Sequence, residues 1–120
     1  MSQWKLVEKF ELSIGDSIQV QNHKIKFKAV PWDNRCPKDV QCIMAGYAVA
    51  ELELVDDTGQ NIAKDINITA DQDNLLHPEI YELKQGYKLV TGRFDPYPIS
   101  TQIIRPEDYT LEVWLVKEDQ

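Results

Sequence analysis

The clearest signal in this chain is a two-residue alternation of apolar and polar side chains. Such a period places alternate residues on opposite faces of a strand and predicts half-buried β-strands. In residues 24–30 the polar positions are all lysines, and lysines on an outer face also discourage pairing with other strands. The residues expected to face the core are Ile25, Phe27 and Ala29 in 24–30, Ala48, Ala50, Leu52 and Leu54 in 48–55, Ile62, Ile66 and Ile68 in 61–69, and Tyr109, Leu111, Val113 and Leu115 in 109–116.

Turn signals separate these segments and three shorter predicted strands at 10–14, 17–21 and 87–90. Gly15-Asp16 separates 10–14 from 17–21, and Asn22-His23 has the spacing of a tight hairpin between 17–21 and the strand that follows. The segment DDTGQ at 56–60 is predicted to join two strands by a glycine turn. The prolines in 95–98 interrupt any ladder because proline has no backbone N–H to donate. We predict an all-β single domain over residues 1–120, an antiparallel sandwich or barrel-like sandwich of seven or eight short strands. At most one helical turn is expected, in 71–86, where Pro78 limits it.

Charge and composition narrow the classes of partner. Twenty acidic residues against thirteen basic ones give a net charge of −7 at pH 7. This balance argues against nucleic acid and against an anionic membrane surface, and it leaves a protein with a basic surface as a partner. No apolar run reaches the roughly 18 residues that a membrane span requires. The first residues, MSQWKLVEKFEL, do not have the pattern of a signal peptide.

Cys36 and Cys42 are the only cysteines, and they lie in the turn-rich segment DNRCPKDVQCIMAG at 33–46. Four alternatives are open: a local disulfide, a zinc site, a reactive cysteine or two free thiols. Five intervening residues with Pro37 among them allow the two Cα atoms to approach bonding distance, which favours the disulfide. Zinc would need His23 and His77, which lie far apart in the chain. A disulfide would indicate an oxidising, extracytoplasmic compartment, and reduced cysteines a cytoplasmic one.

The same segment resembles a signature of an uncharacterised group of bacterial secreted and lipoprotein-like domains. The pattern D-S-R-C-P-x-x-V-x-C-(I/V)-W-A-G followed by an alternating strand is matched from Asp33 to Gly46 and into residues 48–54. Asn34 stands where serine is usual and Met44 where tryptophan is usual. The flanking segments 10–20 and 87–116 resemble the group more weakly. The resemblance implies an extracytoplasmic β-sandwich with a disulfide, and it implies no activity.

Four residues are candidates for binding. Asp33 and Arg35 flank the first cysteine and could hold a polar ligand, although an Asx turn and an ion pair between them are the favoured alternatives. Trp32 and Tyr97 could form an aromatic platform for a sugar or a peptide, together with Trp114 on the outward face of its predicted strand. The alternative for these rings is burial by a loop or by a second sheet.

Evidence for catalysis or metal binding is weak. The sequence contains no G-x-S-x-G, no H-E-x-x-H and no glycine-rich phosphate loop. Residues 71–82 share alternating acids and a terminal glutamate with a calcium loop, but Leu76 stands where the loop needs glycine. We therefore predict no cofactor, no metal and a non-enzymatic envelope binding domain. The two alternatives are an accessory domain without a ligand and a hydrolase with paired carboxylates.

Overall fold

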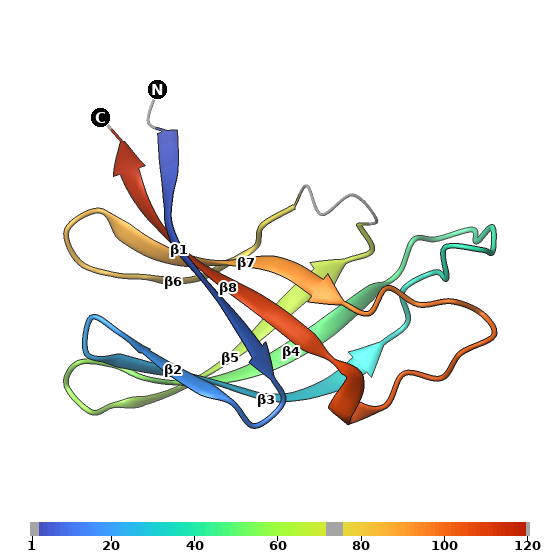
Figure 1. Ribbon diagram of the computed structural model, residues 1–120, viewed down its shortest axis with the longest axis horizontal. Helices are drawn as coiled ribbons and strands as arrows, with labels where there is room; N and C mark the ends of the chain where they lie inside the picture. Colours follow the sequence, from blue (N-terminus) through green and yellow to red (C-terminus); the bar gives the residue numbers. More distant parts are fainter. Residues whose placement is uncertain (1–2, 72–75, 120) are drawn as a thin grey trace.

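The chain folds almost entirely into strands, as predicted. The computed structural model describes residues 3–71 and 76–119, and within them are eight strands and one short 3-10 helix (Figure 1). The strands are β1 (Gln3–Ser13), β2 (Ser17–Val20), β3 (His23–Asp33), β4 (Tyr47–Val55), β5 (Asn61–Thr69), β6 (Glu79–Glu82), β7 (Tyr87–Asp95) and β8 (Thr110–Asp119), and the helix is η1 (Pro106–Asp108).

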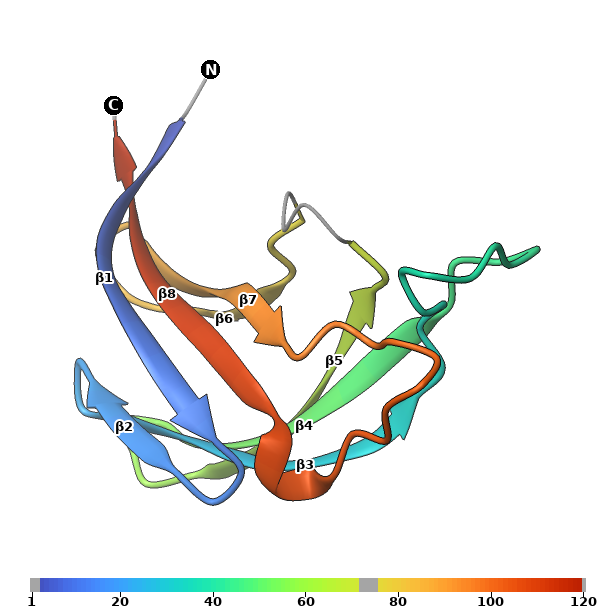
Figure 2. The same cartoon turned by 45° about the vertical axis from the view of Figure 1, so that its right-hand side comes forward.

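The strands form two antiparallel sheets that face each other, which confirms the predicted sandwich. One sheet has the order β1-β8-β7-β6 and the other the order β2-β3-β4-β5. Figure 2 shows the two layers and the short turn by which β1 leads from the first sheet into β2 of the second. Every described strand pair is antiparallel. Short turns join β2 to β3, β4 to β5 and β6 to β7, whereas residues 34–46 and 96–109 form the longer connections from β3 to β4 and from β7 to β8.

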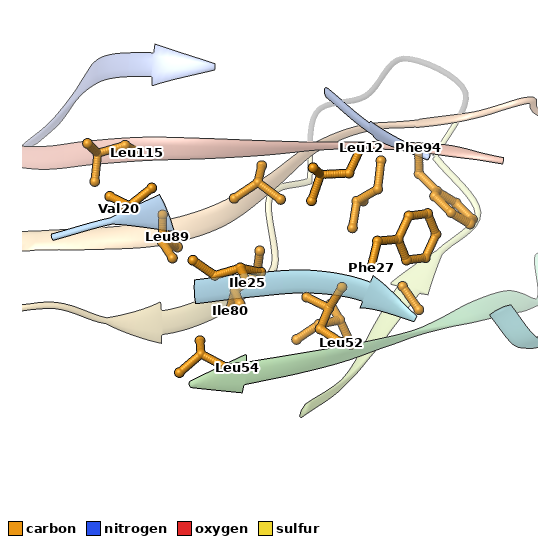
Figure 3. Packing of buried hydrophobic residues seen from close by; sticks show 14 of the residues in the cluster. Leu12, Val20, Ile25, Phe27, Leu52, Leu54, Ile80, Leu89, Phe94 and Leu115 are labelled. Atoms are coloured by element: carbon orange, nitrogen blue, oxygen red, sulfur yellow. The ribbon is translucent and has the colours of Figure 1, made fainter. Parts of the chain in front are cut away.

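The core lies between the sheets and is made of the residues that alternate inward. Ile25, Phe27 and Leu54 from the second sheet and Leu111 and Val113 from the first belong to it, and all five are completely buried. Figure 3 shows Ile25, Phe27 and Leu54 among other buried side chains of this core. Burying a side chain of this size stabilises the fold by about 1.5–3 kcal/mol. Most other predicted core positions are also buried. The half-buried ones are Ala29, Ile62 and Ile68.

One local prediction was wrong. The hairpin turn after β2 is Gln21-Asn22, both with left-handed φ of 50° and 63°, and not Asn22-His23. His23 is instead the first residue of β3, where it is buried and pairs with Val20. Within the segment expected to hold a helical turn, residues 79–82 form strand β6, while residues 72–75 lie outside the described part.

The first and last strands are neighbours. β1 and β8 pair along their whole length, from Gln3 opposite Asp119 to Ser13 opposite Thr110. Figure 1 shows the two ends of the chain side by side, and the ends of β1 and β8 extend away from the second sheet. Over residues 3–71 and 76–119, no helix has the length and apolar character that a membrane crossing requires.

Candidate binding site at the disulfide loop

The loop between β3 and β4, residues 34–46, projects from one end of the sandwich (Figure 2). Cys36 and Cys42 are joined by a disulfide within it, with their Cα atoms 6.0 Å apart, so the predicted disulfide is confirmed. The base of the loop continues the ladder of β3 and β4. The N–H of Asn34 donates to the carbonyl of Tyr47 at 3.0 Å, and that of Cys36 to the carbonyl of Ala45 at 2.7 Å.

Gly46 lets the two sides of the loop approach this closely. Its φ is +77°, and a Cβ there would stand 2.2 Å from the carbonyl oxygen of Asn34. No side chain fits at that distance, and L-residues rarely adopt that backbone conformation. Gly46 therefore allows the backbone just before β4 to run in close contact with the backbone of Asn34.

A buried ion pair fixes the start of the loop. The Arg35 guanidinium donates from Nε and Nη2 to the two Asp33 oxygens, each at 2.9 Å. Nη2 also donates to the Pro96 carbonyl at 3.0 Å, and the Tyr109 hydroxyl donates to Asp33 at 2.8 Å. The guanidinium lies over the ring of Phe94, 4.7 Å from its centre. These contacts join the loop to β7 and to the start of β8 through groups far apart in the sequence.

The ionisation of the network follows from its contacts. Burial opposes the charge of Asp33, but the hydrogen bonds from Arg35 and Tyr109 and the arginine charge outweigh it, so the pKa of Asp33 lies below its usual value. Burial raises the pKa of Tyr109, and its bond to the Asp33 carboxylate raises it further. The network therefore holds a carboxylate, a guanidinium and a neutral phenol at neutral pH, which agrees with the structural alternative for Asp33 and Arg35.

A second set of bonds ties the loop to the segment after β7. The N–H of Lys38 donates to the Pro98 carbonyl at 3.0 Å. Asp39 accepts bonds from the Ser100 N–H at 2.9 Å and from the Ser100 hydroxyl at 2.5 Å, and these bonds lower the pKa of Asp39. Disulfide, ion pair and these three bonds together give the loop one defined shape.

The tip of this fixed loop is apolar and exposed. Ile43 is fully exposed, with a relative exposure of 103%, and Met44 follows at 78% and Val40 at 44%. Beside the tip is an open hollow of about 580 Å³. It is lined by both cysteines and Val40, Met44, Asp71 and Tyr97, among others. Met44 thus faces solvent and not the core.

The four predicted binding residues lie at this end of the molecule but in different environments. Trp32 is half exposed and its ring centre lies 6.4 Å from that of Tyr47 on the adjoining strand. Tyr97 lines the hollow and stands 5.4 Å from the Arg35 guanidinium. Asp33 and Arg35 are occupied by the network beneath. A binding role for Trp32 and Tyr97 stays a prediction.

Sequence reasoning missed a second apolar surface, on the outer face of the first sheet. The outer-face cluster consists of Trp4, Leu6, Val90, Trp114 and Val116, bordered by His77 and Lys88 around a shallow hollow of about 300 Å³. Trp114 and Val116 do point away from the core, as the alternation predicts, but the cluster buries Val116 and half-buries Trp114. Trp4 lies in a segment without regular alternation, so only the sheet topology brings it to this surface.

Two acidic residues near the β4–β5 turn have structural roles. Asp56 accepts bonds from the backbone of Thr58 and Gln60 in the β4–β5 turn, and Asp57 pairs with Lys84 at 2.5 Å. Within residues 3–71 and 76–119, no three acidic, histidine or cysteine side chains are grouped as metal ligands. The segment compared with a calcium loop includes residues 72–75, which lie outside the described part.

Comparisons with known proteins identify no relative: no family model, curated protein or solved structure matches this chain.

Proposed function

We propose that this protein is a non-enzymatic binding domain of an oxidising, extracytoplasmic compartment, and that it binds a partner protein through the tip of the disulfide loop. The observation that carries the proposal is the exposure of Ile43, which is complete, and of Met44, which is 78%, on a loop held by a disulfide and by the Asp33–Arg35 network. Exposed apolar groups that cluster on a surface are characteristic of interaction sites.

The rigidity of the loop supports binding for an energetic reason. A flexible loop loses conformational entropy when a partner orders it, and each immobilised side chain costs about 0.5–1.5 kcal/mol. Here the bonds from Lys38 and Asp39 to residues 98–100 and the disulfide hold the backbone in place before any partner arrives. Binding of a partner to the apolar tip therefore requires little further loss of backbone conformational entropy in the loop.

The overall charge indicates the kind of partner. A net charge of −7 favours approach to a basic surface and disfavours approach to an acidic one. An acidic residue also stands near the tip of the disulfide loop, because Asp71 lines the same hollow as Met44. We infer a partner that offers an apolar pocket for Ile43 and Met44, surrounded by lysine or arginine. Such an encounter weakens as salt is added, because salt screens exposed charges.

Site-specific photo-crosslinking tests the proposal in the organism that encodes the protein. A photoreactive phenylalanine analogue replaces Met44 in one variant and Thr58 in a control, because Thr58 is exposed in the β4–β5 turn at the opposite end of the sandwich. The expected result is a discrete crosslinked protein from position 44 and none from position 58. Identical patterns from both positions, or none from either, would contradict the proposal and favour an accessory domain without a ligand.

Affinity measurement with the crosslinked partner then tests the named side chains. Ile43→Ser combined with Met44→Ser is expected to weaken binding at least about tenfold, since apolar anchors in a partner's pocket carry much of an interface's affinity. Leu76→Ser is the matched control, because Leu76 is also exposed but lies outside the loop. Equal effects of the two changes would show that the tip is not the anchor.

A further inference from the structure

One of the two edges of the first sheet lies along β1; the other lies along β6. β1 is the outermost strand of the order β1-β8-β7-β6, and its residues Gln3–Lys9 are all exposed. Figure 1 shows this half of the strand reaching past the second sheet, together with its neighbour β8. Such an edge presents backbone N–H and C=O groups on which another strand can pair. Trp4, Leu6 and Val7 stand on it with exposures of 41%, 42% and 51%.

The faces of β1 follow from its register with β8. Leu6 pairs with Val116 and Glu8 with Leu115, so the register shifts and Val7 is the extra residue of a β-bulge. Leu6 thus shares the outer face with Val116, and Glu8 shares the inner face with Leu115. By the same alternation, Trp4 and Lys9 belong to the outer face, and Lys5 belongs to the inner face with Glu8.

We propose that two copies of this chain pair antiparallel through their β1 edges, about a two-fold axis between Leu6 and Val7. In this register Lys5 of one copy lies opposite Glu8 of the other, and Glu8 opposite Lys5. Both residues are on the inner face, so their side chains meet and two ion pairs form per dimer. This interaction is separate from the loop-tip binding proposed above.

The bulge makes this register consistent. In a regular strand, residues an odd number of positions apart point to opposite faces and could not meet across a two-fold axis. The extra residue Val7 returns Lys5 and Glu8 to one face. The outer-face pair in this register is Trp4 opposite Lys9, and Leu6 stands opposite the bulged residue Val7. A lysine ammonium beside a tryptophan ring is a favourable contact, and this chain already places Lys88 over Trp4 at 3.9 Å.

Neighbouring registers lack this complementarity. Sliding one copy by one residue in one direction sets Lys5 of the inner face opposite Lys9 of the outer face, so their side chains do not meet. Sliding in the other direction sets Trp4 of the outer face opposite Glu8 of the inner face, so again no ion pair forms. Opposite charges that face each other on one side of a strand pair stabilise it. The sequence of the edge therefore selects one register of self-pairing.

Charge reversal tests the dimer and its register together. Sedimentation equilibrium would be measured for the wild type, Lys5→Glu, Glu8→Lys and the double variant. We expect a dimer for the wild type, dimerisation weakened at least about tenfold in each single variant, and recovery in the double variant, which restores both pairs in reverse. Lys24→Glu is the control, because Lys24 is an exposed lysine on β3 in the other sheet.

The outcomes separate the parts of the proposal. A wild type that stays monomeric up to about 1 mM, the range of weak specific complexes, overturns the dimer. A dimer that tolerates both single reversals overturns the β1 interface. Loss in the single variants without recovery in the double variant overturns the register. Circular dichroism of each variant checks folding, and hydrogen exchange of residues 3–9, slowed in the dimer and not in the single variants, gives an independent readout.

Discussion

Replacing Arg35 by leucine measures how much the buried ion pair stabilises the fold. Arg35→Leu removes two bonds to the Asp33 carboxylate and one to the Pro96 carbonyl. The Arg35 and Asp33 side chains are only 2% and 13% exposed, so water can replace few of the hydrogen bonds that the substitution removes. Breaking a buried pair costs about 3–5 kcal/mol. In the variant, Asp33 keeps its hydrogen bond from Tyr109 and its partial contact with solvent. These remaining contacts favour the lower end of that range, a loss of about 3 kcal/mol in the free energy of unfolding.

The chain supplies a matched control for this measurement. Arg93 and Asp95 form the same kind of pair two residues apart, with bonds of 3.2 and 3.3 Å, but their side chains are 58% and 40% exposed. Exposed pairs contribute about 0.2–1 kcal/mol, so Arg93→Leu is expected to cost no more than that. Urea unfolding followed by tryptophan fluorescence gives both free energies.

A double-mutant cycle isolates the pair itself. Asp33→Asn, Arg35→Leu and the double variant are expected to give a coupling energy of about 2 kcal/mol, because the second change removes a charge that the first has left unpaired. If Arg35→Leu costs no more than Arg93→Leu, or if the coupling energy is below about 0.5 kcal/mol, the claim that burial strengthens this pair is refuted.

The pH dependence has a defined sign. The pKa of Asp33 is lower in the folded chain than the unfolded value of about 3.9, so its contribution is present above that pH and is lost as pH falls through the folded pKa. The free energy difference between the wild type and Asp33→Asn is therefore expected to shrink from neutral pH to about pH 3. A difference that stays constant over this range would contradict the assigned shift.

Three further predictions concern other parts of the loop end. Alkylation of the unreduced, denatured protein is expected to add no label by intact mass, and replacing Cys36 and Cys42 by alanine should lower the free energy of unfolding by about 2 kcal/mol in urea; two labels would contradict the disulfide. Gly46→Ala is expected to cost at least about 2 kcal/mol in the same assay because its Cβ would meet Asn34, and an unchanged midpoint would contradict that contact. The raised pKa of Tyr109 predicts a contribution to stability that is complete below pH 10 and lost above it, so Tyr109→Phe should be less sensitive to alkali in urea unfolding than the wild type; equal sensitivity would argue against the shift.

The sequence predicted the central strands well because their alternation is imposed by burial on one face. It predicted the start of β1 poorly. Residues 3–9 are exposed on both faces and contain a bulge, so no regular pattern marks them as a strand. In β7, Leu89, Val90 and Thr91 are buried in succession, because the outer-face cluster covers the second face. A period of two cannot appear where both faces are covered.

The candidate site was only partly predictable. The spacing of Cys36 and Cys42 indicated their disulfide, and the pairing of Asp33 with Arg35 was among the alternatives. Pro96 and Tyr109 could not be assigned to the same network, because their contacts join residues 61 and 76 positions apart. Such contacts depend on how the two sheets pack and leave no local pattern. The exposure of Ile43 has the same origin, since an isoleucine near a strand would ordinarily be expected inside.

The adjacency of β1 and β8 determines how this domain can be attached to something else. Figure 1 shows both termini together at the end opposite the disulfide loop. A fusion partner, surface linker or affinity tag at either terminus would therefore hold the protein by one end and leave the loop facing outward. The same adjacency means that a short peptide could join Asp119 to Gln3, with a new opening in the β4–β5 turn. A circularly permuted chain of this kind would keep both sheets and the loop end intact.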